Sequence, residues 1–223
     1  MAFGHVILRE FHIDRQAEYF EDYCRRYSDM PMLVRLEEKD GSLVPGRFLR
    51  ADDLDGKLGE DNNPEWKTVA FDEETGTLVS PNGSIGYRWG EKGEWNLEEK
   101  ADGKEAKLQM SLILDDDHDD VRGVDFPYFG GAATEAFTTG DQRPDVLTKN
   151  IPVKRIQTTD GEVLVATVFD LFCANYGVDR GLGGDWVATS YDEDVPGTPA
   201  WAEKITGVPA DKIAHVAREF ADT

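Results

Sequence analysis

The spacing of apolar residues predicts that the sequence begins in a helix. Phe3, Ile7 and Phe11 follow one another at steps of four along and just beyond Met1–Glu10, which places them on one helical face. No capping residue precedes this pattern. We therefore expect that the helix starts upstream of the first residue.

A second helix is expected over Arg15–Tyr27. Asp14 is placed to cap it, because a short carboxylate can accept hydrogen bonds from the first free backbone N–H groups. Met30 and Pro31 end it, since proline disfavours helical geometry at the residue before it. The first thirty residues therefore predict a pair of helices.

Short strand-like runs replace the helical spacing from Met32 to about Gln157. The strand candidates are Leu33–Leu36, Phe48–Leu49, Thr68–Phe71, Thr77–Val79, Lys107–Leu114, Val153–Gln157 and Val163–Val165. Turn sequences lie at Lys39–Gly41, Glu74–Gly76, Pro81–Gly83 and Asp160–Gly161, and Asp52–Leu58 is expected to hold one short helix. This part of the sequence is interpreted as a β-rich block with long loops.

Helical patterns return in the last part of the sequence. Ala166–Tyr176 is apolar on most faces, and Gly177 is placed to follow its C-terminus in the left-handed conformation. A further helix is predicted to start at Thr198–Pro199 and to stop at Gly207. Pro209 opens the last one, whose apolar positions recur at three and four. The fold class is therefore a mixed α/β fold, with helices at 1–30, a β-rich block at 31–165 and helices at 166–223.

The charge balance restricts the partners of this protein. The 223 residues contain 45 Asp and Glu against 24 Lys and Arg, which gives a net charge of −21. Such a charge opposes binding to nucleic acid and to anionic lipid, which both need a basic surface. Two explanations remain open, namely a saline habitat in which acidic surfaces keep proteins soluble, and an acidic subunit that meets basic partners. Neither a membrane-spanning apolar run nor a signal peptide is expected.

Residues that could carry chemistry are few. Cys24 and Cys173 are far apart and lie in apolar patterns, so two buried free thiols are expected. The run Asp115–Asp120 contains His118 but lacks the glycine and the glutamate of a calcium loop, so a solvated acidic loop is the expected reading. Gly177–Gly184 is glycine-rich but follows a helix, so it is expected to be a mobile connection or a helix stop.

The histidines and the aromatic run Gly86–Leu97 are two further candidates. His5, His12 and His215 lie in or beside helical patterns without a second histidine at four, so each is expected to be structural. Gly86–Leu97 contains Trp89 and Trp95 with arginine and glycine, a combination typical of interface anchors and equally of the core of a β-rich block. No Ser-His-Asp or Cys-His set is recognisable.

Long runs of the sequence resemble the catalytic α subunit of membrane-bound respiratory nitrate reductases, a branch of the molybdopterin oxidoreductases. They are Gly4–His12, Tyr27–Val34, Asn62–Phe71, Pro81–Gly93, Phe126–Gly131, Pro152–Arg155, Ala174–Gly177, Ala188–Asp192 and Thr198–Pro209. The last run is the least specific, because many molybdopterin oxidoreductases have a similar helix pair. The resemblance extends over essentially the whole chain.

The resemblance implies an internal fragment whose helices belong to the α/β domain of a molybdopterin oxidoreductase and whose β-rich block is inserted there. Members reduce nitrate to nitrite at molybdenum held by two molybdopterin guanine dinucleotides, with quinol electrons that arrive through [4Fe-4S] clusters. Their cluster cysteines, aspartate molybdenum ligand and nucleotide-binding segments would lie outside this sequence. No catalytic or metal residue is therefore transferred, and no cofactor is expected in the isolated chain.

The family's partners would be an iron–sulfur β subunit and, through it, a membrane cytochrome b. The parent enzyme would lie at the cytoplasmic face of the membrane, or at the outer face in a halophilic archaeon. Two alternatives stay open. One is a related molybdenum reductase of chlorate or selenate, and the other is a free-standing acidic module that binds proteins through Gly86–Leu97.

Overall fold

The computed structural model describes residues 1–58, 63–81, 98–101, 104–107, 109–114, 117–127 and 146–222. Its helices are α1 (Ala2–Ile7), the π-helix η1 (Leu8–Asp14), α2 (Glu18–Tyr27), α4 (Val168–Asn175), α5 (Pro199–Thr206), α6 (Ala210–Ala221) and the 3₁₀ helices η2 (Ala51–Leu54) and η3 (Pro64–Trp66). Its strands are β1 (Leu33–Lys39), β2 (Ser42–Phe48), β3 (Ala70–Phe71), β4 (Leu78–Val79), β5 (Glu98–Ala101), β6 (Lys104–Lys107), β7 (Asp120–Pro127), β8 (Val146–Thr158) and β9 (Gly161–Thr167). The mixed α/β class is confirmed.

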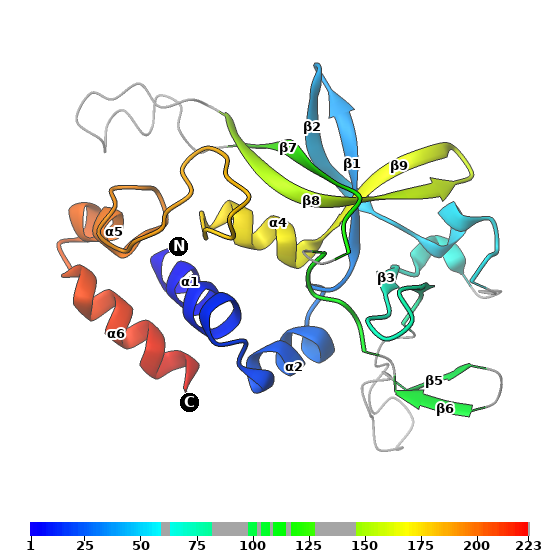
Figure 1. The fold of residues 1–223 in the computed structure, drawn as a ribbon, viewed down its shortest axis with the longest axis horizontal. Coiled ribbons are helices and arrows are strands. Elements are labelled where there is room, and N and C mark those ends of the chain that lie inside the picture. The colour runs from blue at the N-terminus through cyan, green and yellow to red at the C-terminus, as the bar shows by residue number, and fades with distance from the viewer. Residues whose placement is uncertain are drawn as a thin grey trace.

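Five of the strands form a closed barrel in the order β1-β2-β7-β8-β9 (Figure 1). Neighbouring strands are antiparallel except β2 and β7, which run parallel and meet at Leu43 and Val124. Closure leaves no free edge between these strands, so their backbone hydrogen bonds are made within the barrel. The barrel interior is apolar and includes Val34, Ile151 and Val153.

Strands β1 and β9 are covered on both faces. Val34 and Ala166 point into the barrel, whereas their neighbours Leu33 and Val165 point into a second apolar core outside it. Leu54 from η2 contributes to that second core. Burial on both faces fits the unbroken apolar run Val163–Ala166 of β9, which does not alternate with polar residues.

Strand β8 belongs to two pairings along its length. Its first part, Val146–Val153, pairs with β7, and its second part, Lys154–Thr158, pairs with β9. The same strand therefore connects the two halves of the barrel wall. The hairpin with β9 was predicted, although the structure places its two-residue turn at Thr159–Asp160 rather than at Asp160–Gly161.

The turn between β1 and β2 follows directly from the sequence. Asp40 and Gly41 join the paired residues Lys39 and Ser42 with φ values of 52° and 85°. A two-residue hairpin turn with both φ values positive matches the strand twist, and Asp-Gly is among the sequences that adopt it most easily.

Helices α1, α5 and α6 form a layer away from the barrel, and both ends of the chain lie in it (Figure 1). Small side chains fill the contacts, because Ala2 and Ala202 meet Ile213, and Val6 meets Ala214 and Ala217. Alanines at these positions allow the helix axes to approach closely. The layer depends on small apolar stripes rather than on a large core.

A third cluster lies between the helical layer and the barrel. Phe169 and Cys173 of α4 pack there with Leu8 of the π-helix and Cys24 of α2. Helix α4 starts where β9 ends, and the hydroxyl of Thr167 caps it by accepting from the Asp170 amide at 2.9 Å. One continuous piece of chain therefore spans from the barrel wall to the helices.

Two details of the N-terminal helices differ from the sequence prediction. The first helix continues as a π-helix through Leu8–Asp14, and the second begins only at Glu18, after Ala17. Asp14 does not cap α2, because its carboxylate instead bonds Arg9 within the π-helix at 3.1 Å. The C-terminal helices begin and end as predicted, with Thr198 as the N-cap of α5 and Gly207 left-handed after it.

The strand predicted over Lys107–Leu114 is wrong for its described residues beyond β6. Residues 109–114 run without a strand partner, apart from an isolated bridge between Asp72 and Met110. The alternation is real, but Met110, Leu112 and Leu114 point into three different cores. Alternating burial alone therefore does not make a strand when the backbone has no neighbouring strand to pair with.

Candidate functional site

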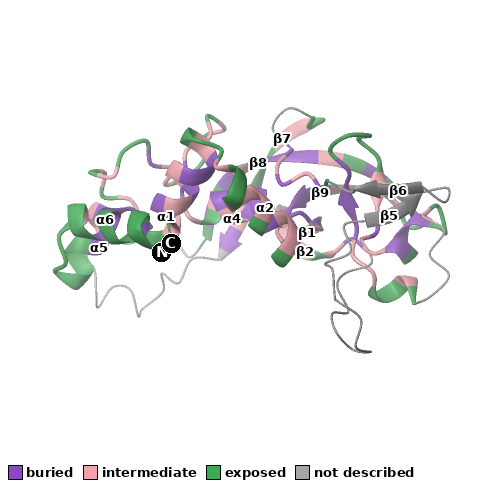
Figure 2. Cartoon of the chain, turned by 90° about the horizontal axis from the view of Figure 1, so that it is seen from below, coloured by how far each residue is buried: buried purple, intermediate pink, exposed green. Residues whose placement is uncertain are grey.

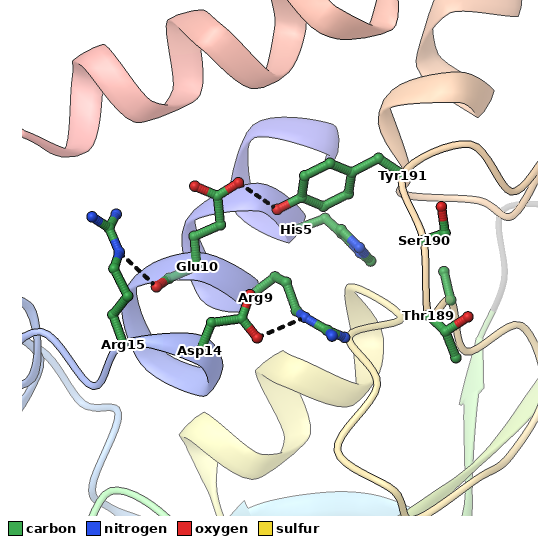
Figure 3. Close-up of a pocket in the computed structure, with 9 residues that line it drawn as sticks. His5, Arg9, Glu10, Asp14, Arg15, Thr189, Ser190 and Tyr191 are labelled. Carbon is green, nitrogen blue, oxygen red and sulfur yellow. Dashed lines mark hydrogen bonds and ion pairs between the residues drawn. The ribbon is translucent and has the colours of Figure 1, made fainter.

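A groove of about 510 Å³ lies between the π-helix and the loop at residues 188–191 (Figure 3). Its walls carry His5, Arg9, Glu10, Asp14, Arg15, Ala188, Thr189, Ser190 and Tyr191. The two walls are far apart in the sequence and meet only in the folded chain. Polar and charged side chains dominate, so the groove has the character of a polar binding surface rather than of an apolar pocket.

The π-helix determines which side chains reach the groove. A π-turn accommodates one more residue than an α-turn, and such turns often occur at functional sites. At the end of η1, Gln16 adopts a positive φ of 45°, and the Ala17 amide bonds the Phe11 carbonyl at 2.7 Å. This local geometry places Arg9 and Glu10 on the groove wall.

Glu10 is the centre of the strongest polar contact of the groove. Arg218 of α6 donates to its two carboxylate oxygens at 2.7–3.0 Å, and the Tyr191 hydroxyl donates at 2.9 Å. The hydrogen bonds from Arg218 and Tyr191 lower the pKa of Glu10. Burial and the Glu10 carboxylate raise the pKa of Tyr191, so its hydroxyl remains a donor. This carboxylate therefore holds the π-helix, α6 and the loop together.

Two further arginines line the same wall. Arg9 bonds Asp14 through Nε at 3.1 Å, and its guanidinium points toward the side of Thr189 (Figure 3). Arg15 donates from Nε to the Glu10 carbonyl at 3.1 Å and lies over a phenylalanine ring at 4.0 Å. The charged side chains that line the groove are therefore these two arginines and the carboxylates of Glu10 and Asp14, so their formal charges cancel.

His5 is the buried end of the groove. Its Nδ1 lies 2.8 Å from the Tyr176 carbonyl, and its ring meets Tyr191 edge-on at 5.9 Å. Burial lowers the pKa of His5, which favours the neutral ring that donates Nδ1–H to that carbonyl. The expected structural role of His5 thus agrees with its contacts.

The opposite wall is fixed by Glu193. One of its carboxylate oxygens accepts from the amide and hydroxyl of Thr189 at 2.8 and 2.7 Å and from the Ser190 amide at 2.8 Å. These bonds lower the pKa of Glu193. Because one carboxylate accepts all three hydrogen bonds, Glu193 fixes the shape of the loop at Thr189 and Ser190.

A second polar centre lies inside the molecule. Arg180 pairs with Asp170 at 2.7 Å, and both side chains are almost fully buried. Asp170 Oδ2 also lies 2.8 Å from the Thr167 hydroxyl and accepts from the Leu114 amide at 3.2 Å. A buried pair with this many hydrogen bonds fixes α4 against the segments that cross it, so its role is positioning.

The acidic run has the geometry of a solvated loop over its described part, 117–120. Asp117 pairs with Lys154, and the side chain of Asp119 accepts from the Arg155 amide at 2.8 Å. Residues 115–116 lie outside the described part of the chain. Across the described residues, no three His, Cys, Asp or Glu side chains come together as a metal site.

The glycine-rich segment Gly177–Gly184 is attached to the barrel. Gly177 has the left-handed φ of 69° expected after a helix. Beyond it, Gly184 bridges to Lys149, and the Asn150 side chain donates to the Leu182 carbonyl at 2.7 Å. The predicted helix stop is confirmed, and the segment contacts β8 through this isolated bridge and this hydrogen bond.

Cys24 and Cys173 are buried free thiols, as predicted, and burial raises the pKa of Cys24 to about 11. His12 is buried with Nδ1 at 3.3 Å from Glu21, whereas His215 is exposed on α6. The loop Gly86–Leu97 lies outside the described residues, so its interface reading stays a prediction.

Sequence reasoning did not identify the residues that build the groove. Arg9, Glu10, Tyr191 and Arg218 come from three separate segments without a shared motif. The only sequence signal was the unusual charge of Arg9-Glu10 inside an apolar helical run. A charged pair there indicates a helix face that is not entirely in the core.

Comparison with known proteins agrees with the expected resemblance. The chain is 56% identical over its full length to the respiratory nitrate reductase 1 alpha chain of Escherichia coli (strain K12). It is 40% identical over its full length to the respiratory nitrate reductase alpha chain of Bradyrhizobium sp. It is 38% identical over 99% of its length to the nitrate reductase alpha chain of Bacillus subtilis (strain 168). No protein-family model matches.

The matched region is a small part of those relatives. The chain spans 18% of the Escherichia coli protein, 20% of the Bradyrhizobium protein and 17% of the Bacillus protein. The resemblance to nitrate reductase α chains that the sequence indicated is therefore confirmed, and it concerns one segment of them.

Proposed function

We propose that this chain is a segment of the catalytic α subunit of a respiratory nitrate reductase, and that its role in the subunit is architectural. The observation that carries the proposal is the 56% identity over the full chain to an α chain of that enzyme. In this proposal residues 1–30 and 166–223 are helices of the subunit's α/β domain, and residues 31–165 are a block inserted between them.

The distribution of exposed apolar side chains supports an architectural role. Of the eleven large ones exposed in the described part of the chain, all but Trp66 and Val146 lie on or beside α1, α2, α5 and α6. Three of them, Tyr19, Tyr23 and Tyr27, follow one another on α2 at steps of four. Figure 2 shows green, exposed segments along α5 and α6, whereas purple, buried positions recur along β8. A helical layer with an apolar outer face fits a place inside a larger subunit.

The cofactors of the proposed parent enzyme are a molybdenum bis(molybdopterin guanine dinucleotide) and [4Fe-4S] clusters. The residues present do not fit the cluster, because it needs four thiolates and the sequence has two cysteines that are buried in an apolar core. No step of nitrate reduction is therefore assigned to a residue of this chain. The groove beside the π-helix serves as a binding wall, since Arg9 and the Thr189 hydroxyl are held in place by hydrogen bonds to carboxylates.

The proposed partners are an iron–sulfur β subunit and, through it, a membrane cytochrome b, with nitrate as the substrate of the parent enzyme. The proposed location is peripheral at the membrane. Over the part of the chain that the structure describes, no helix combines the length and apolar character that crossing a membrane requires.

The architectural role can be tested in the complete α subunit with a matched pair of variants. Phe220→Glu places a charge on the helical layer at a side chain that is 72% exposed, and Trp66→Glu does the same near the barrel at 76% exposure. We expect Phe220→Glu to reduce the accumulation of assembled, nitrate-reducing enzyme and Trp66→Glu to leave it near the parent level. Equal behaviour of the two variants would contradict the proposed role of the helical layer.

The assignment to nitrate reductase has its own test. The reading frame around these residues is expected to continue on both sides, and the complete protein is expected to bind molybdenum and iron and to reduce nitrate. A complete protein that reduces chlorate or selenate in preference to nitrate would favour a related molybdenum reductase. A reading frame limited to these residues would favour the free-standing acidic module.

A further inference from the structure

His5, at the buried end of the groove beside the π-helix, has one ring nitrogen that the fold does not use. The side chain is 1% exposed, and its Nδ1 donates to the Tyr176 carbonyl at 2.8 Å. In the neutral ring Nε2 is then a hydrogen-bond acceptor, and it has no hydrogen-bond partner among the residues that the structure describes. A buried acceptor without a donor is unfavourable, and the groove that His5 lines gives a ligand access to it.

Arg9 offers the complementary group on the same side of the groove. Its Nε is held by Asp14 at 3.1 Å, and within the described chain its two terminal nitrogens make no other hydrogen bond or ion pair. A guanidinium in this state binds a carboxylate through two parallel hydrogen bonds. Figure 3 shows the Arg9 guanidinium and the His5 ring pointing toward the loop that carries Thr189 and Ser190.

That loop supplies one further donor. Ser190 Oγ accepts from the Asp192 amide at 3.2 Å, which leaves the hydroxyl hydrogen of Ser190 for a ligand. The Thr189 hydroxyl is not available, because it donates to Glu193 at 2.7 Å. Since Glu193 also holds the Ser190 amide, the loop is ordered before a ligand binds.

The charges and the size of the groove select the class of ligand. Arg9 and Arg15 are balanced by the carboxylates of Glu10 and Asp14, so no net charge attracts a small free anion. The volume of about 510 Å³ is also that of a ligand site rather than of an ion site. A ligand has to bring an anionic acceptor for Arg9 and a donor for His5. An acidic residue of a polypeptide carries both, as its side-chain carboxylate and its backbone N–H.

We propose that the groove binds a segment from the remaining part of the same α subunit through one Asp or Glu residue. The carboxylate of that residue pairs with Arg9 and accepts from Ser190, and its backbone N–H donates to His5 Nε2. This inference rests on the proposed function, in which most of the subunit lies outside these residues, as in the Escherichia coli relative of which the chain spans 18%.

The same subunit is favoured over a separate one because the contact is small. Stable interfaces between separate proteins bury about 1,200–2,000 Å², which a contact centred on a single residue does not supply. A segment of the same polypeptide is already held nearby by its covalent connection, so a few hydrogen bonds are enough to dock it. The groove also lies in the helical layer, where Arg218 of α6 binds Glu10 of the groove wall.

The decisive experiment is a structure of the complete α subunit. We expect an Asp or Glu carboxylate of the same polypeptide within hydrogen-bonding distance of the terminal nitrogens of Arg9. A groove that holds only water or an adventitious ion, or one filled by another subunit, would overturn the proposal. Nitrate reduction by the same preparation tests the proposed function separately, so an empty groove in an active enzyme counts against this inference alone.

Limited proteolysis of the complete subunit gives a second readout. We expect Arg9→Gln to speed cleavage of the docked segment about tenfold, because a hydrogen bond to a charged group is lost and cleavage follows the population of the undocked segment. Arg122→Gln is the matched control, since Arg122 is a partly exposed arginine of the barrel strand β7, and it should leave the cleavage rate unchanged.

Combining Arg9→Gln with the amide substitution of the docked acid should add no further loss, because both changes remove the same contact. Additive effects, or an unchanged cleavage rate in Arg9→Gln, would contradict the proposed pair.

Discussion

The barrel and the helical layer solve the problem of burying apolar surface in different ways. The barrel is closed, and β1 and β9 have apolar cores on both faces. The helices α1, α5 and α6 meet through alanine-rich stripes and leave Val216 and Phe220 of α6 exposed. The barrel is thus complete within this chain, whereas the helical layer has an apolar outer face that water does not favour. The difference indicates that the two regions depend to different extents on the rest of a larger protein.

The largest loss of stability is expected from a substitution at the place where the barrel and the helices are joined. Asp170→Ala would leave the buried Arg180 guanidinium and the Leu114 amide without this carboxylate. Removing one partner of a buried pair costs about 3–5 kcal/mol, because the other charge stays desolvated. We expect this loss in the free energy of unfolding from denaturant titration.

Hydrogen exchange of the backbone amides then shows which region of the variant is destabilised. Faster exchange in both the barrel and the helices would support the conclusion that the Asp170–Arg180 pair joins them. Faster exchange in the helices alone would show that the barrel is stable without this pair. The matched control is Asp179→Ala, which removes a partly exposed carboxylate that accepts a hydrogen bond from the Gly181 amide at 2.9 Å.

The second prediction compares the stability loss from one substitution in the barrel with that from one substitution in the helical layer. Ile151 is fully buried in the barrel, so Ile151→Ala is expected to cost about 2–5 kcal/mol through lost burial and a residual cavity. Phe220 is 72% exposed, so Phe220→Ala in the same chain should change stability by no more than about 0.5 kcal/mol. Chemical denaturation of both variants measures the difference. A large loss for Phe220→Ala would mean that the outer face of the layer is already covered.

A smaller effect concerns the ion pair of the helical layer. Glu10→Gln should cost about 0.2–1 kcal/mol at neutral pH, since Arg218 is partly exposed and solvent screens the pair. The pKa of Glu10 is lowered in the folded chain, so its contribution is present above about pH 4.5 and is lost as the pH falls through the folded-state value.

Thermal unfolding from pH 7 down to about pH 3 checks this sign, with the stability gap between the two proteins closing at low pH. Glu18→Gln on α2 is the control, because this exposed carboxylate makes no ion pair among the described residues. A gap that widens toward acid would rule out the assigned role of Glu10.

The smallest change in stability is expected from salt, and it should be similar in the barrel region and in the helical parts. Residues 31–165 hold 29 acidic against 16 basic side chains, and the helical parts hold 16 against 8, so both carry a similar density of negative charge. Screening weakens this repulsion, and the Tm should rise by a few degrees between about 0.1 M and about 2 M potassium chloride. A flat or falling Tm would show that the acidic groups are locally compensated.

The sequence by itself determined most element positions in the C-terminal part. Thr198 before Pro199 and Gly207 after the helix fix the ends of α5, because capping and the left-handed φ are local properties. Asp40-Gly41 fixed its hairpin for the same reason. The resemblance to nitrate reductase α chains was also readable from the sequence, since long identical runs do not depend on the fold.

The tertiary structure alone decided how distant segments combine. Alternation over residues 109–114 could not reveal that Met110, Leu112 and Leu114, which are two residues apart, enter three separate cores. Neither could periodicity show that Glu10 would meet Arg218 across 208 positions, or that a glycine-rich segment would cover Lys149. Such contacts depend on chain crossing in space, and local propensities carry no information about it. The sequence therefore specified the elements and the relatives, and the fold specified the groove, the buried pair and the buried amine of Lys149.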